Sequence, residues 1–534
     1  MKVKDKSIAN LLARHGMPPV VAEAFNGMVT AKTDPLTGGV EVQMLAASDI
    51  PSVNNTIALL GDSITLRNQQ GATAVWNNEG YFIVANMLMG QRYEIVYVTG
   101  LSGYTIEQIA ASGLQSVLSS GAKTCFVLAG TNNAADADAA TIYEKLTSLL
   151  WEPLRAAGIR VVAGTIPPNG GWTATQSGKM MAVNDMIRAA PSIYPGLRVA
   201  DLWAATVDGA TGAPRSGVFV DSIHPSARGA MYFARAIAAA LDGVDVIVPK
   251  RSSGGRLDPR ILNPNPLAFG NNATGTNGFI LGVGGTGTGP DQWSVSSSNA
   301  ATTFTCSGNN ARNPVDYIDG KSLDVSVTYG GDDHYFQAFT KSDSGDNYLD
   351  RVWAATTAKV HGAIVKPTAG RNGFVYKAVT SGTTGGAEPT WPTVAGNCVT
   401  DGTVTWMAIK DVVAGDVYEF EAEVVFSALS GTVCPMLRIS FDNAGYTGVL
   451  RPLLIANGVA VPSVDTNPVS PGFNTGSNAW DYVPLNEPIV IRSQKIVIPS
   501  QDIVSHISPQ FRLYGKNGTT ATFKVQRLEF RRVG

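Results

Sequence analysis

Two short segments of this chain carry the side chains that proteins use to cleave esters. The first, GDSI at 61–64, places a serine just after an apolar run. The second, DSIHPS at 221–226, places a carboxylate three residues before an imidazole. A serine hydroxyl becomes nucleophilic when a histidine takes its proton and a carboxylate fixes the tautomer of that histidine. These residue types predict Ser63 as nucleophile, His224 as its base and Asp221 as the group that orients the base.

Acyl transfer also needs hydrogen-bond donors aimed at the oxyanion of the tetrahedral intermediate. LSGYT at 101–105 offers the backbone N–H of Gly103, and AGTNN at 129–133 offers the side-chain amide of Asn132. Each of these segments follows an apolar run, as the candidate serine does. Turns that contain Gly and Asn are common, so no single segment indicates a site. The ordered set of four segments is what predicts an acyl-transfer centre.

Two further residues could contribute to this centre. Asp62 could be a catalytic acid, but stabilisation of the turn before Ser63 is the better interpretation. Trp172 lies in the Gly-flanked segment 165–178, which we expect to be a loop at the same edge of the fold. Its indole could stack on a sugar ring or could anchor the loop, and the sequence favours neither.

Alternating strands and helices are expected to position these segments. Four apolar runs are typical of buried parallel strands, at 57–61, 93–98, 124–130 and 159–166. Apolar residues recur at helical spacing in three stretches, at 105–120, 140–158 and 227–243. This alternation predicts an α/β fold whose parallel sheet is covered by helices on both faces. Such sheets bind ligands at the carboxyl ends of their strands, where the candidate residues would lie.

The pattern changes near residue 250, after which hydrophobic residues alternate with period two. The alternating segments lie at 323–330, 416–427, 436–442, 489–499 and 521–533. They predict an antiparallel β-sandwich of a jelly-roll-like, carbohydrate-binding kind. We therefore expect four parts, which are an N-terminal segment at 1–45 with one helix at 19–31, the α/β domain at 46–250, the β-sandwich at 251–354 plus 412–534, and a small inserted β module at 355–411.

The bulk composition argues against several kinds of partner. The net charge of −2 does not suit a polyanion, so we expect no nucleic acid. No stretch approaches the roughly 18 apolar residues of a membrane span, and we expect no membrane insertion. The segment 1–17 lacks the features of a secretory signal. Cys125 lies in an apolar run and is expected to be a buried thiol. The four cysteines lack metal-ligand spacing, and their positions do not decide whether any of them form a disulfide.

The ordered set of polar segments resembles the SGNH hydrolases, also called GDSL esterases, over roughly residues 55–245. GDSI matches the first block of that family, and Gly103 matches the glycine of its second block. Gly130-Thr131-Asn132-Asn133 matches the third block, although the family usually has Asp where this chain has Asn133. We expect that departure to alter local loop geometry rather than activity. Asp-x-x-His, the fifth block, matches Asp221 and His224.

The resemblance implies a flavodoxin-like α/β fold and a serine carboxylester hydrolase. Ser63 would be the nucleophile, and the oxyanion hole would consist of the N–H groups of Ser63 and Gly103 together with the Asn132 amide. The implied mechanism has two steps through an acyl-enzyme, and it requires no metal and no cofactor.

A second and less specific resemblance links the chain to bacteriophage tail fibres and tailspikes. It rests on the segments 263–278, 373–393 and 399–409. It implies a homotrimeric receptor-binding protein of the phage tail that removes acetyl groups from bacterial capsule or O-antigen polysaccharide. The residues at 1–45 would attach it to other virion tail proteins. Two alternatives remain, which are a secreted, extracellular bacterial carbohydrate esterase with a glycan-binding module and a tail protein that binds glycan without catalysis.

Overall fold

The structure of the chain is a computed structural model. It describes residues 29–33, 40–44, 55–68, 80–242, 280–289, 293–309, 322–340, 352–360, 363–370, 372–411, 417–441, 480–492, 496–497 and 507–532. The chain forms two compact units, one of Met1–Asn55 with Gly243–Arg251 and the other of Thr56–Asp242 with Ser252–Gly534.

The first unit contains an antiparallel pair of strands, β1 (Val29–Thr33) and β2 (Val40–Met44). The sequence predicted a helix over 19–31. Residues 19–28 lie outside the described part of the chain, but residues 29–31 belong to β1, so the prediction is wrong there. β-branched residues such as Val29 and Thr33 favour a strand when a partner strand lies opposite, and β2 supplies that partner.

The second unit begins with a five-stranded parallel sheet, ordered β4-β3-β5-β6-β7. Its strands are β3 (Thr56–Asp62), β4 (Glu94–Leu101), β5 (Thr124–Leu128), β6 (Arg160–Gly164) and β7 (Arg198–Ala200). Four of these strands match the predicted apolar runs, and β7 was not predicted. In chain order the arrangement is 2-1-3-4-5, the doubly wound order of flavodoxin-like folds, which reverses direction beside its first strand. Ligands bind at that point, and here it lies at the carboxyl end of β3.

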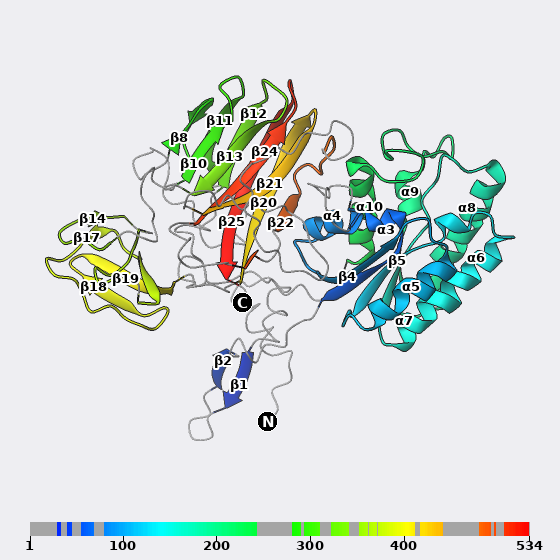
Figure 1. Cartoon of the computed structure of the whole chain (residues 1–534), viewed down its shortest axis with the longest axis horizontal. Coiled ribbons are helices and arrows are strands. Elements are labelled where there is room, and N and C mark those ends of the chain that lie inside the picture. Colours follow the sequence, from blue (N-terminus) through cyan, green and yellow to red (C-terminus); the bar gives the residue numbers. More distant parts are fainter. Residues whose placement is uncertain are drawn as a thin grey trace. The chain divides into compact units, whose positions relative to one another are not determined.

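Helices cover both faces of this sheet, as predicted (Figure 1). They are α3 (Ser63–Leu66), α4 (Tyr81–Leu88), α5 (Ile106–Leu118), α6 (Ala139–Lys145), α7 (Glu152–Ala156), α8 (Ala174–Ala189), α9 (Leu202–Thr206) and α10 (Ala227–Ala240). Successive residues of a strand point to opposite faces. Accordingly, Leu59 of β3 packs in the cluster that contains α4 and α10, and Leu60 packs in the cluster that contains α5 and α8.

The helix predicted at 140–158 is interrupted. A turn of π-helix at Leu146–Trp151 separates α6 from α7. Pro153, in the first turn of α7, has no N–H to donate to the preceding turn, so a regular helical ladder cannot run through it.

Two larger sheets form most of the rest of this unit. One has the order β21-β24-β13-β10-β8, and the other has the order β22-β20-β25-β12-β11-β9, with β23 paired to β20. The strands are β8 (Ile280–Leu281), β9 (Gly285–Gly287), β10 (Trp293–Ser297), β11 (Thr303–Asn309), β12 (Ser322–Thr328), β13 (His334–Thr340), β20 (Val417–Ser430), β21 (Val433–Phe441), β22 (Pro488–Arg492), β23 (Ile496–Val497), β24 (Ile507–Gly515) and β25 (Thr520–Arg532).

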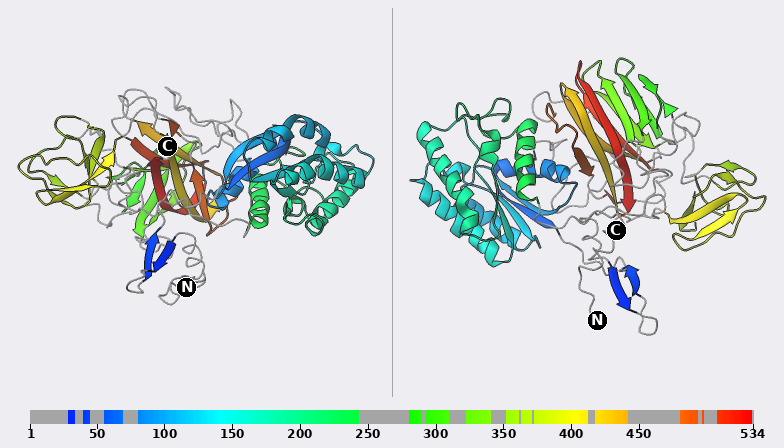
Figure 2. Two further views of the ribbon diagram at one scale, coloured as in Figure 1. Left: turned by 90° about the horizontal axis from the view of Figure 1, so that it is seen from below. Right: turned by 180° about the vertical axis from the view of Figure 1, so that it is seen from behind.

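The two larger sheets pack against each other (Figure 2). The ring of Phe336, on β13, lies 5.1 Å from that of Phe304 on β11 and 5.6 Å from that of Phe523 on β25. Paired strands are antiparallel except β8 with β10 and β9 with β11. The predicted antiparallel sheets are therefore present, and the jelly-roll connection stays a prediction.

A separate four-stranded antiparallel sheet has the order β15-β16-β19-β18. Its strands are β15 (Ile364–Val365), β16 (Phe374–Ala378), β18 (Cys398–Asp401) and β19 (Val404–Lys410), and β14 (Ala358–Lys359) pairs with β17 (Gly382–Thr383) beside it. The indoles of Trp353 and Trp406 both donate to Oδ2 of Asp401, at 2.7 and 2.9 Å. Trp406 is fully buried, so it belongs to the core of this sheet and not to its surface.

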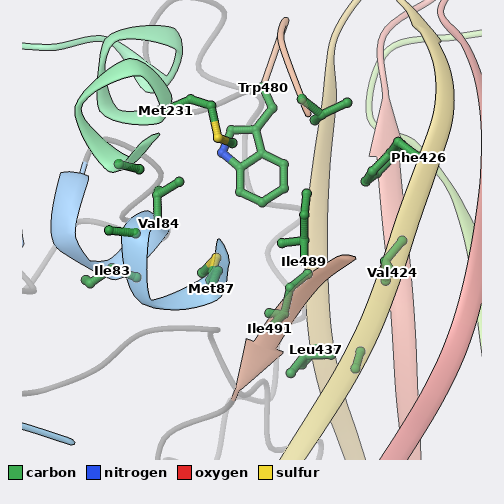
Figure 3. Close-up of a cluster of buried hydrophobic side chains, with 14 of the residues drawn as sticks. Ile83, Val84, Met87, Met231, Val424, Phe426, Leu437, Trp480, Ile489 and Ile491 are labelled. Atoms are coloured by element: carbon green, nitrogen blue, oxygen red, sulfur yellow. The ribbon is translucent and has the colours of Figure 1, made fainter. Parts of the chain in front are cut away.

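Helices α4 and α10 share one hydrophobic core with the larger sheets. Trp480 is fully buried and lies beside Met231 of α10 and Val84 of α4, and Ile489 and Ile491 of β22 lie alongside (Figure 3). The apolar face of the two helices is therefore closed by residues from the β-rich half of the chain.

Polar contacts connect the same elements at the edge of that core. Gln91 Nε2, just after α4, donates to the backbone oxygen of Val490 at 2.7 Å. Arg228 of α10 forms an ion pair with Asp481 at 2.9 Å. The α/β region and the segment at 480–492 are therefore held together by both apolar and polar contacts.

Replacing Trp480 tests the importance of this shared core. Trp480→Ala should destabilise the unit by about 3–5 kcal/mol, because it leaves a large cavity between α10 and β22. Amide hydrogen exchange of α4 and α10 should become faster. Trp406→Ala is the matched control, since it removes an equally buried indole from the separate sheet. Unchanged protection of α4 and α10 in Trp480→Ala would contradict the shared core.

Candidate active site

Ser63 is the first residue of α3 and directly follows β3. β4 and β5 flank β3, so three strand ends meet at this point. A Cβ atom on Gly61 would lie 2.2 Å from both the Leu128 oxygen and Thr65 Oγ1. Only glycine allows the strand to turn so close to its neighbours, and this turn presents Ser63.

Asp62 is the N-cap residue of α3, and its Oδ1 accepts a hydrogen bond from the N–H of Ile64 at 3.0 Å. This is the turn-stabilising contact that the sequence favoured. Its other oxygen, Oδ2, is buried without a hydrogen-bond partner in the described part of the chain. The hydroxyl of Thr131 is near, but it does not reach hydrogen-bonding geometry.

The candidate base contributes to the electrostatic environment of Asp62. Burial raises the pKa of this carboxyl from 3.8 to about 6, although the hydrogen bond from Ile64 and the charge of His224 act in the opposite direction. The charge of His224 therefore acts on the residue next to Ser63.

Ionisation of Asp62 should cost folding free energy. A carboxyl whose pKa is raised in the folded state stabilises the fold when protonated, and this stability is lost as the pH rises through about 6. Asp62→Asn keeps an oxygen for the Ile64 N–H and carries no charge. It should raise the free energy of unfolding by about 1–3 kcal/mol at neutral pH, and this gain should shrink towards about pH 4. Denaturant unfolding at the two pH values checks this, and an equal gain at both would exclude titration of Asp62 in this range.

Asp221 and His224 form the pair that the sequence predicted. Asp221 Oδ2 lies 2.7 Å from His224 Nδ1, and Asp221 Oδ1 accepts the backbone N–H groups of Ile223 and His224, each at 2.7 Å. Partial burial acts to raise the pKa of Asp221. The hydrogen bonds from His224 and Ile223 together outweigh this effect and lower the pKa from 3.8 to about 2. A carboxylate only accepts hydrogen bonds, so Nδ1 of the neutral imidazole carries its proton, and Nε2 can act as the base.

The loop that carries this pair is closed at both ends. The N–H of Val220 donates to the oxygen of His224 at 2.9 Å. The Ser226 hydroxyl then accepts the N–H of Gly229 at 3.1 Å and caps α10. These local contacts fix the imidazole at the start of a long helix.

The two predicted oxyanion segments lie at the ends of β4 and β5 and are hydrogen-bonded to each other. Asn132 Nδ2 donates to the backbone oxygen of Tyr104 at 2.9 Å. Gly103, next to Tyr104, has a φ of +77°, a left-handed conformation that favours glycine. A primary amide has two N–H groups, so one can donate to Tyr104 while the second is left for another acceptor.

The segment that carries Trp172 is joined to the loop that carries Asp221 and His224, since the N–H of Gly170 donates to the oxygen of Ser222 at 2.9 Å. Trp172 itself is half-buried and packs against the cluster beneath α5 and α8. Of the two interpretations, this packing favours the one in which Trp172 anchors the loop. The segment 165–178 is not a loop throughout, because Thr173 and Gln176 form a capping box that begins α8 at Ala174.

Sequence reasoning missed a set of charged residues behind the oxyanion segments. Glu107, Asp136 and Lys145 surround the side chain of Asn133. Asn133 itself was the signal that could have indicated these charged residues, since SGNH hydrolases usually have a carboxylate at this position and this chain has an amide.

Three further findings concern the described residues as a set. None of their His, Cys, Asp and Glu side chains form a group of three or more that could hold a metal ion. No helix among them is long and apolar enough to cross a membrane. None of the four cysteines forms a disulfide among these residues, and Cys125 is buried as predicted.

Residues 59–231 match the model of the GDSL-like lipase/acylhydrolase family. The matched segment runs from β3 into α10 and contains Ser63, Asp221 and His224. The α/β region is therefore a GDSL-type acylhydrolase domain. No curated protein matches the chain in sequence.

Solved structures similar to this chain include a GDSL-like lipase from Bacteroides thetaiotaomicron, with 18% identity over 36% of this chain and 89% of that one and a TM-score of 0.29. An acetyl xylan esterase has 18% identity over 35% of this chain and 99% of its own, with a TM-score of 0.29. A carbohydrate esterase family 3 protein from Talaromyces cellulolyticus has 21% identity over 35% and 95%, with a TM-score of 0.27.

Proposed function

We propose that the α/β domain is a serine esterase that removes O-acetyl or similar short acyl groups. The observation that carries this proposal is the 2.7 Å contact between Asp221 and His224, whose charge acts on Asp62, the residue next to Ser63. A carboxylate on Nδ1 leaves Nε2 to act on a serine hydroxyl, which is the arrangement of a serine hydrolase.

The proposed reaction has two steps. Nε2 of His224 takes the proton of Ser63 Oγ while Oγ attacks the ester carbonyl, and the N–H groups of Ser63 and Gly103 and the amide of Asn132 bind the oxyanion. The imidazolium then protonates the departing alcohol, and an acyl-enzyme remains. A water molecule, activated by the same imidazole, releases the acid and restores Ser63.

We further propose that the substrate is bacterial capsule or O-antigen polysaccharide and that the chain belongs to a phage tail. The similarity of residues 263–278, 373–393 and 399–409 to phage tail proteins supports this part of the proposal. The first of these segments lies outside the described residues, and the second runs from β16 towards β18. In this proposal the chain is a homotrimer, the β-sandwich binds glycan, and residues 1–45 contact other virion tail proteins.

Acetate release from a panel of purified capsules and O-antigens tests the substrate. At least one O-acetylated polysaccharide should release acetate, and the same polymer after mild alkaline deacetylation should release none. Ser63→Ala should release none from either polymer. Hydrolysis of small aryl acetates together with no release from any polysaccharide would contradict the proposed substrate but not the esterase.

A further inference from the structure

Asn133 occupies a site where its two amide functions meet different partners. It is buried, and its Oδ1 accepts the N–H of Ile106, the first residue of α5, at 3.0 Å. Its Nδ2 donates to Asp136 Oδ2 at 2.9 Å and to Glu107 Oε2 at 3.1 Å. Both donors of this side chain therefore point at carboxylates, and its oxygen holds the start of α5.

A carboxylate at residue 133 would face two other carboxylates, those of Glu107 and Asp136. Lys145 Nζ forms ion pairs with both Glu107 and Asp136. Lys179 donates to the backbone oxygens of Ala134 and Asp136. Partial burial acts to raise the pKa of Glu107. Hydrogen bonds, of which that from Lys145 has the largest effect, together outweigh burial and lower the pKa from 4.5 to about 2. Glu107 is therefore ionised at neutral pH, and Lys145 is the ammonium group that forms ion pairs with both carboxylates.

The contacts of Asn133 fall between the two oxyanion segments. Ile106 directly follows the segment that carries Gly103, and Asn132 precedes Asn133 in the segment after β5. Asn132 also holds the oxygen of Tyr104, so two adjacent amides connect the same pair of segments. A shift of Asn133 would change the distance between Gly103 and Asn132. Misplacement of an oxyanion donor by about 1 Å is enough to slow catalysis strongly.

We propose that Asn133 is a positioning residue whose neutral amide, held between Glu107 and Asp136, sets the spacing of the oxyanion donors Gly103 and Asn132. We call Asn133, Glu107, Asp136 and Lys145 the oxyanion clamp. The proposal rests on the proposed esterase function for its kinetic consequences. It also predicts a coupling between residues 133 and 107 that does not depend on that function.

The central variant is Asn133→Asp, which has nearly the same shape but places a third carboxylate against two others. Both donors are lost, and like charges at hydrogen-bonding distance repel. On a small aryl acetate kcat should fall by about 10- to 100-fold while KM stays within about twofold, because the oxyanion forms only in the transition state. Hydrogen exchange of the Ile106 amide should become faster.

The double variant Asn133→Asp/Glu107→Gln provides the decisive comparison. Glu107→Gln removes one negative charge. Its side-chain amide can also donate an N–H to the carboxylate introduced at residue 133, so that donor and acceptor exchange places. It should restore kcat to within about threefold of the unmodified protein and should restore protection of the Ile106 amide. Asp138→Asn is the matched control, since Asp138 caps α6 through the Thr141 N–H and makes no hydrogen bond to Asn133. Combined with Asn133→Asp, the Asp138→Asn substitution should restore neither kcat nor the protection of the Ile106 amide.

Each outcome of this experiment decides the proposal. If Asn133→Asp does not fold, the clamp requires that the Glu107→Gln double variant folds and is active. An inactive or unfolded double variant, or equal recovery with Asp138→Asn, overturns the clamp. A loss of stability in Asn133→Asp with unchanged kcat also overturns it. If Ser63→Ala were to keep full activity, the proposed function would fail, while recovery of Ile106 protection would still establish the coupling.

Discussion

Ser63→Ala should lower kcat on a small aryl acetate by at least about 10³-fold, because Ser63 is the group proposed to form the acyl-enzyme. The remaining rate would come from the oxyanion donors and from binding alone. The variant should fold normally, since the Gly61 turn and the Asp62 cap of α3 do not depend on the serine hydroxyl. Steady-state kinetics and a circular dichroism spectrum of the same preparation measure both expectations.

Ser222→Ala is the matched control for that measurement. Ser222 lies in the loop that carries Asp221 and His224, but the described contact of this residue is through its backbone oxygen, which accepts the Gly170 N–H. Removal of its hydroxyl should leave kcat within about threefold of the unmodified protein, as for surface substitutions generally. Activity of Ser63→Ala within tenfold of the unmodified protein would remove Ser63 from the mechanism.

Asn132→Ala should lower kcat by about 10²- to 10³-fold with little change in KM. The hydrogen bond from Asn132 becomes strong only as charge develops on the substrate oxygen, so its loss affects the transition state more than the bound ester. Full kinetic curves are needed, because a single substrate concentration cannot separate kcat from KM. A rise in KM at constant kcat would mean that Asn132 holds the substrate and does not stabilise the oxyanion.

Asn132→Asp refines the interpretation of the alanine variant. It keeps the size of the side chain but cannot donate to the Tyr104 oxygen or to an oxyanion. A fall in kcat at least as large as that of Asn132→Ala is expected, since the added charge repels the oxyanion. Near-normal kcat in Asn132→Asp would show that the amide is not a donor in the reaction.

The candidate site could be predicted in part because some of its geometry is local. Asp221 and His224 are three residues apart, and the carboxylate reaches both the imidazole and the backbone of the same turn. Ser63 follows a strand whose apolar residues are evident in the sequence. Parallel strands end at one edge, so the sequence also implied that Gly103 and Asn132 lie near that serine.

Other elements could not be predicted because their partners lie far away in the chain. The helix expected at 19–31 includes residues that pair as β1 with β2, and a strand needs such a partner to form. The start of α8 was assigned to a loop, although its Thr-x-x-Gln capping box was present in the sequence. In that case the signal was local and was overlooked among glycines and prolines.

The sequence by itself determined the strand and helix alternation, the nucleophile turn and the Asp221–His224 pair, because periodicity and short spacings act within one or two turns of backbone. Only the tertiary structure decided that Asn133 lies between Glu107 and Asp136, and that Trp480 closes the core over α10. These contacts join residues with no local relationship in the chain. They form because a buried amide must find partners for all its donors and acceptors, and because the apolar face of a helix must be covered.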